Sequence, residues 1–200
     1  MSITDERVRR RAAQRVADAY DRTISEWHEA MELEREFVKA HLQPGQDMPK
    51  VTTLTGTRRD EFSRRVEMYR ADALAAVKNL RDRVNGIVTE APSDEHVRAL
   101  QVYMMRDDVS DAERRAFLDR YGDNYQARRV LKDRNVLDTS EYDDALASLA
   151  EVEENVSSVL DAGKILDGTV TPGSVAFSKS FIPEKFSLTA PQNGGDRGDE

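Results

Sequence analysis

Apolar residues recur at alternating steps of four and three between residues 13 and 38, and charged residues fill most positions between them. This spacing is the a/d period of helices that pack side by side. No glycine or proline interrupts residues 4–42, so the pattern predicts one long helix there. Glu34 is the one charged residue on the stripe. The expected seam residues of this helix are Tyr20, Ile24, Trp27, Met31 and Val38.

A second stripe with the same steps runs through residues 57–91. It follows a linker over residues 43–56, in which Pro44 and the glycine after it end the first helix. Pro92 should end the second helix, because proline has no backbone N–H to donate. The two helices predict a long helical hairpin over residues 1–91. The expected seam residues of the second helix are Phe62, Val66, Tyr69 and Leu80.

Residues 93–137 carry the start and stop signals of short helices. Ser93 can cap one helix, and Ser110 with Glu113 forms a capping box for the next. Gly122 is a stop signal for that second helix. We therefore expect three short helices with tight connections, forming a small head.

A third stripe lies in residues 138–167, which we expect to form one long helix that packs on the hairpin or on a partner chain. Its expected seam residues are Leu149, Val152, Val156 and Val159. Three of these are valines, and β-branched side chains suit a tight helix–helix seam. Together the elements predict an all-α protein with a coiled-coil-like bundle.

Residues 168–200 form a C-terminal arm of different composition, rich in Ser, Thr, Pro and Gly. The stretch SVAFSKSFIPEKFSL alternates apolar and polar residues at its start, which favours an extended, strand-like peptide. The last ten residues are expected to be disordered. The arm either packs back on its own bundle or docks into a partner protein. Its candidate docking residues are Phe177, Phe181, Ile182, Phe186 and Leu188.

Composition and charge narrow the class of protein. Charged residues make up 34% of the chain and apolar residues 38%, with no cysteine, which excludes disulfides and thiolate chemistry. No signal-peptide core or membrane-length apolar stretch is present, so we expect a protein of the cytoplasm, or of a virion if it derives from a phage. Residues 138–167 account for the net charge of −8, because they contain nine acidic residues and a single basic one, Lys164. That segment should repel nucleic acid and attract basic partners.

Candidate catalytic chemistry is sparse. His28, His41 and His96 are not preceded by a glutamate three residues earlier, as the Glu-x-x-His pairs of helical di-iron sites require. The sequence also lacks a P-loop, a GxGxxG turn and a serine nucleophile elbow. We therefore expect no metal, no cofactor and no catalytic residues, and a protein that is not an enzyme.

DNA binding by the head remains an alternative. Arginine pairs at 114–115 and 128–129 lie on short helices around Gly122, as in a helix-turn-helix protein. Nine acidic residues balance the nine basic ones over residues 92–137, whereas binding to phosphates needs a concentrated positive face. Nucleic acid is therefore the less favoured partner.

The layout of long helical rods, a small head and a C-terminal arm resembles that of bacteriophage head-assembly (scaffolding) proteins. It predicts a non-enzymatic scaffold or adaptor that self-associates through its helical stripes, forms a homo-oligomer and docks a protein partner by its arm. Two alternatives are a helical DNA-binding regulator and an acidic inhibitor of a nucleic-acid-binding protein. The identity of the partner, and whether the long helices pair within or between chains, stay open at this stage.

Overall fold

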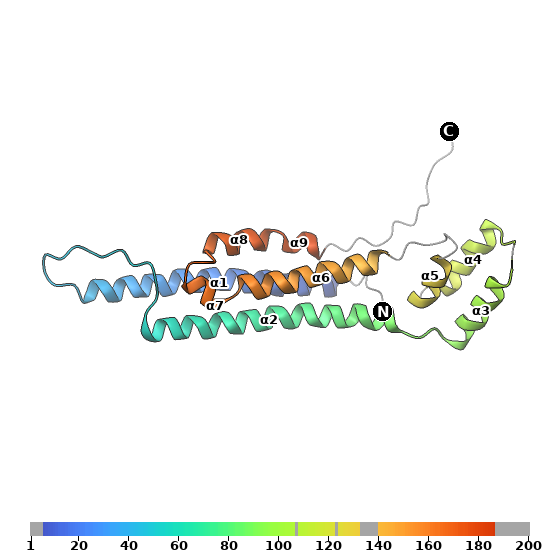
Figure 1. Ribbon diagram of the computed structural model, residues 1–200, viewed down its shortest axis with the longest axis horizontal. Helices are drawn as coiled ribbons and strands as arrows, with labels where there is room; N and C mark the ends of the chain where they lie inside the picture. Colours follow the sequence, from blue (N-terminus) through green and yellow to red (C-terminus); the bar gives the residue numbers. More distant parts are fainter. Residues whose placement is uncertain (1–5, 107, 123, 133–139, 187–200) are drawn as a thin grey trace, which may run out of the picture. The chain divides into compact units, whose positions relative to one another are not determined.

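The computed structural model describes residues 6–106, 108–122, 124–132 and 140–186. Every regular element in these ranges is an α-helix, which confirms the all-α class (Figure 1). The described residues form two compact units. We call residues 7–80 with 148–186 the bundle unit, and residues 81–147 the head unit.

The bundle unit is built on α1 (Glu6–Ala40), α2 (Gly56–Thr89) and the second half of α6 (Ser140–Val159). Hydrogen bonds join α1 to both other helices: Tyr20 donates to Asn155 Oδ1 at 2.6 Å, and Arg65 donates to Glu26 Oε1 at 2.5 Å. The three helices therefore pair within one chain (Figure 1). Their fully buried side chains include Val16, Tyr20, Val66, Val77, Leu149, Val152 and Val156.

Most of the expected seam residues lie in this core, and some lie at its edge. The buried ones are Tyr20, Met31, Phe62, Val66, Leu80, Leu149, Val152 and Val156. The half-buried ones are Ile24, Trp27, Val38, Tyr69 and Val159. On α1 the buried face also takes in Val16, Ala19 and Thr23, because this helix contacts α2 and α6 at once.

The linker and the chain after α6 close one end of the bundle unit. Leu54 of the linker and Ile165 of α7 (Ala162–Leu166) are buried against Met31, Phe62 and Val66. Trp27 packs edge-on against Phe62, with ring centroids 5.4 Å apart. These apolar contacts position the linker.

The prediction of a single long helix over residues 138–167 is wrong in one respect. α6 ends at Val159, and α7 is a separate short helix. The reason is local, because the Asp161 carboxylate accepts a 3.1 Å hydrogen bond from Lys164 N and so caps a new helix. Gly163 further weakens helix propensity at this point. Residues 138 and 139 lie outside the described residues.

The extended conformation expected for the arm is also wrong. Pro172–Ser180 form α8, and Ile182–Lys185 form α9. Thr171 caps α8 by accepting a 3.2 Å hydrogen bond from Ser174 N, and Pro172 occupies the first turn, where no N–H is needed. Leu188 and the C-terminal stretch expected to be disordered lie outside the described residues.

The head unit contains α3 (Asp94–Met104), α4 (Asp111–Tyr121) and α5 (Tyr125–Lys132). The expected caps are present: Ser93 accepts from His96 N, and Ser110 with Glu113 forms a capping box. The core of this unit holds Leu100, Tyr103 and Ala127, with Val109, Phe117 and Leu118 packed against it.

The residues that begin α5 are joined to the end of α2 by side-chain hydrogen bonds to free carbonyls. Asn124 donates to Glu90 O at 3.2 Å, and Gln126 donates to Val88 O at 2.6 Å. These two bonds satisfy carbonyl groups that the end of a helix leaves without a partner.

Of the helices in the described ranges, none combines the length and apolar character that crossing a bilayer requires.

Candidate docking surfaces

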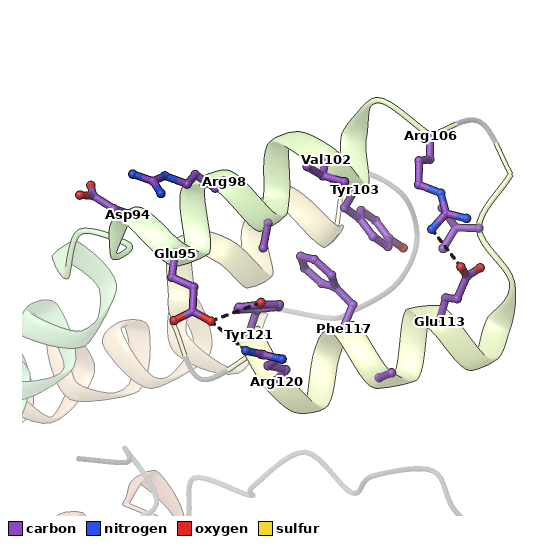
Figure 2. Close-up of a pocket in the computed structure, with 13 residues that line it drawn as sticks. Asp94, Glu95, Arg98, Val102, Tyr103, Arg106, Glu113, Phe117, Arg120 and Tyr121 are labelled. Atoms are coloured by element: carbon purple, nitrogen blue, oxygen red, sulfur yellow. Dashed lines mark hydrogen bonds and ion pairs between the residues drawn. The ribbon is translucent and has the colours of Figure 1, made fainter.

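A groove of about 670 Å³ lies between α3 and α4 in the head unit (Figure 2). Its lining is mainly apolar. Tyr103 of α3 and Phe117 of α4 point toward each other across it, with ring centroids 4.6 Å apart. The small side chains of Ala99 and Ala116 leave room beside them. Val102 also lines the groove, and it remains 64% exposed.

Ion pairs hold the two ends of the groove. At one end Arg106 Nη1 lies 2.9 Å from Glu113 Oε1. At the other end Arg120 Nη2 lies 3.1 Å from Glu95 Oε1, which also accepts from the Tyr121 hydroxyl at 3.4 Å (Figure 2). An apolar centre with polar ends is typical of a surface that takes an apolar group in a fixed orientation.

Glu113 has two roles in this arrangement. It accepts a hydrogen bond from Ser110 N at 3.0 Å and so caps α4, and it pairs with Arg106. The bonds from Ser110, helped by the Arg106 guanidinium, lower the pKa of the Glu113 carboxyl to about 2. The carboxylate is therefore ionised at neutral pH and serves as a fixed hydrogen-bond acceptor.

A second candidate surface is the aromatic pair on α8 and the residue that follows it. Phe177 is 67% exposed and Phe181 is 45% exposed. The two residues lie one helical turn apart in sequence. Their ring centroids are 4.9 Å apart, and the ring planes make an angle of 80°. Large aromatic side chains held in place on a surface are the residue type that most often anchors a protein interface.

The opposite face of this segment fixes it to the bundle unit. Val175, Ile182 and Phe186 are buried. Lys179 Nζ lies 2.6 Å from Asp21 of α1, and Lys185 forms an ion pair with Glu151 of α6, which raises the pKa of the lysine. The phenylalanine pair is therefore presented by an anchored helix.

The candidate docking residues from the sequence divide into two groups. Phe177 and Phe181 are exposed. Ile182 and Phe186 are buried, so the docking interpretation is wrong for them in this fold. The helical spacing of Val175, Ile182 and Phe186 places all three on the face toward the bundle. Leu188 lies outside the described residues.

Sequence reasoning missed the groove. Val102, Tyr103 and Phe117 carry no motif, and their proximity depends on how two separate helices meet. The capping box at Ser110 was the one available signal, since it fixes where α4 begins.

Two of the three histidines have local partners. His41 bonds to Phe37 O at 2.8 Å, and the His96 ring bonds to Ser93 Oγ at 2.6 Å. Within the described ranges, no group of three or more His, Asp or Glu side chains is placed to hold a metal ion.

No family model matches the chain, and no curated protein or solved structure matches it significantly.

Proposed function

We propose that the protein is a non-enzymatic helical scaffold or adaptor that binds protein through Phe177 and Phe181. Its most concrete form is a structural protein of bacteriophage assembly. The supporting observation is the exposed aromatic pair on a helix whose other face is buried. Because α8 is already anchored by Lys179 and its buried residues, docking need not first order a flexible peptide.

We propose a different surface for self-association from the one expected from the sequence. The stripes of α1, α2 and α6 are buried against one another within the chain. Exposed apolar side chains outside those stripes are therefore better candidates for contacts between chains. The aromatic pair and Val102 in the groove are such side chains.

A binding role also suits the chemistry of the groove. A general acid or base works best with a pKa near the operating pH. Glu113 is held at a pKa of about 2 by its bonds to Ser110 and Arg106, far from that range. Glu95 is occupied by Arg120 and Tyr121.

Charge pairing in the head unit makes DNA binding the weaker proposal. Arg106, Arg114 and Arg120 each lie within 4 Å of a carboxylate of the same unit. An electrophoretic shift experiment at about 50 mM salt, where electrostatic binding is strong, separates the two proposals. We expect no shift, and a robust shift would favour the DNA-binding regulator.

The phage-assembly proposal is tested by co-expression with the products of the neighbouring genes. We expect a capsid or portal protein to co-purify with the wild-type chain and to be lost with the double variant Phe177→Ser/Phe181→Ser. Met68→Arg is a matched control, because Met68 is an exposed apolar residue on α2. Capture that survives the double variant, or no capture of any neighbouring product, would contradict the proposal.

A further inference from the structure

The groove between α3 and α4 and the Phe177–Phe181 pair are complementary in size and chemistry. An apolar cavity of about 150 Å³ holds one benzene ring, so two phenyl rings need about 300 Å³. The groove offers about 670 Å³, enough for both rings and the adjoining turn of helix. Its wall already carries the row Tyr103, Phe117 and Tyr121, with successive centroids 4.6 and 4.8 Å apart.

We propose that the groove of one copy receives the Phe177–Phe181 pair of a second copy. This inference rests on the proposed function, because it names the protein surface that the aromatic pair binds. Aromatic rings that enter the groove can extend the existing row in edge-to-face contacts. They also cover Val102, which is 64% exposed in the single chain.

Charge supports the same occupant. Arg98 lines the groove and has no hydrogen bond or ion pair among the described residues, although the other two arginines of the lining are paired. Glu184 is exposed and lies three residues after Phe181. Arg98 lies one helical turn before Val102 on α3. If Phe181 packs over Val102, Glu184 can therefore reach Arg98 of the second copy.

The symmetry of this contact has a direct consequence. Each copy carries one groove and one aromatic pair, so two copies that exchange them reciprocally form a closed dimer with a two-fold axis. A single contact per pair of copies leaves one groove and one aromatic pair unoccupied, and assembly then continues into rings or open chains. Two aromatic side chains bury about 300–500 Å². This is less than the roughly 800 Å² per partner of a stable pairwise interface, so we expect reversible, concentration-dependent assembly.

The test combines two single-defect variants of the full chain. Val102→Arg blocks the groove, and Phe177→Ser/Phe181→Ser removes the rings; both change exposed side chains, and circular dichroism checks the helix content. At about 100 µM, sedimentation velocity should show each variant as a monomer and the wild type as larger species. An equimolar mixture of the two variants should form dimers and nothing larger. In each dimer the intact aromatic pair of one variant occupies the intact groove of the other, and no second contact can form. Met68→Arg should assemble like the wild type.

Charge reversal tests the register. Arg98→Glu alone and Glu184→Arg alone should each raise the dissociation constant at least about tenfold. The double variant carries both reversed charges on every copy and should recover most of the wild-type affinity. Failure of the double variant to recover would overturn the register in which Phe181 lies over Val102.

Other outcomes separate this inference from the proposed function. A wild type that stays monomeric at every concentration overturns the second copy as occupant, and so does a mixture that stays monomeric. If Val102→Arg assembles normally and Phe177→Ser/Phe181→Ser does not, the aromatic pair binds elsewhere: the groove assignment fails and the proposed function stands. If the aromatic variant loses capture of a capsid or portal protein while self-assembly is unchanged, the occupant assigned here is likewise wrong.

Discussion

The carboxylate of Glu34 accepts a 2.6 Å hydrogen bond from the hydroxyl of Thr55, across the linker that joins α1 to α2. Glu34 is only 3% exposed, and its second oxygen lies 3.5 Å from Arg58. These contacts explain why a charged residue stands on the apolar stripe of α1. It binds the last residue before α2 and fixes where the second helix begins.

Removing the Thr55 hydroxyl should destabilise the bundle unit. In Thr55→Val one oxygen of a buried carboxylate loses its hydrogen bond, and we expect a loss of about 1–3 kcal/mol in the free energy of unfolding. Urea denaturation measures it. Thr53→Val is the matched control in the same linker, because Thr53 is exposed and its hydroxyl makes only a 3.5 Å contact with Leu54 O. Equal effects of the two substitutions would contradict the role given to Glu34.

Glu34 shows which parts of this fold can be predicted from the sequence and which cannot. The 3/4 spacing located α1, α2 and most of α6, because a long amphipathic helix is a repeated local signal. In that spacing Glu34 interrupts the apolar stripe, because the pattern distinguishes residues by polarity alone. The partners of Glu34 lie 21 and 24 residues further along the chain, and no local pattern brings them together.

The same limit explains the errors around α1 and the arm. A single stripe assumes one neighbouring helix, whereas α1 has two, so its buried face extends to Val16 and Thr23. In the arm, alternation around Phe177 suggested a strand. The stronger signal was Thr171 followed by proline, a helix cap with proline in the first turn. The groove could not be predicted, because it is formed by the approach of α3 to α4.

A hydrogen bond inside the bundle gives a second prediction. Tyr20 is fully buried and its hydroxyl donates to Asn155 at 2.6 Å, and burial raises the pKa of this hydroxyl well above its ordinary value. Tyr20→Phe should cost about 0.5–1.5 kcal/mol in unfolding free energy. A double-mutant cycle with Asn155→Ala should show that most of this cost is shared. Tyr69→Phe, whose hydroxyl bonds to Glu26 at the bundle edge, should change stability by less than about 0.5 kcal/mol. Additive effects in the cycle would show that the bond contributes nothing.

The division of the arm into exposed and buried residues gives a third prediction. Phe177→Ser should change the unfolding free energy by less than about 0.5 kcal/mol, because the Phe177 side chain is 67% exposed. Phe181→Ser should cost about 1 kcal/mol, because Phe181 is 45% exposed. Ile182→Ala and Phe186→Ala should each cost about 2–5 kcal/mol, because each leaves a cavity under α8 and α9. Thermal and urea unfolding measure both pairs. Similar losses for both pairs would show that the aromatic pair belongs to the core.

The capping box of α4 gives a prediction about pH. Bonds from Ser110 and the charge of Arg106 lower the pKa of Glu113 to about 2, compared with 4.5 for an unperturbed glutamate. A carboxyl whose pKa is lowered by folding contributes stability above its unfolded pKa and loses it as pH falls toward the folded value. The cap should therefore weaken between about pH 4.5 and pH 2.

Carboxyl chemical shifts recorded by NMR during an acid titration would follow Glu113 directly. We expect its midpoint near pH 2, with the amide signals of the first turn of α4 changing over the same range. Ser110→Ala removes the hydroxyl bond, the second cause of the shift, and keeps the backbone N–H bond, which is the largest. The Glu113 pKa should therefore rise only part of the way toward 4.5, because the Ser110 N–H and Arg106 still lower it. Glu113→Gln should remove the contribution of Glu113 to the pH dependence of α4 in this window. An ordinary midpoint for Glu113 in the wild type would mean that the capping box does not persist in solution, and the end of the groove held by Arg106 would then be open.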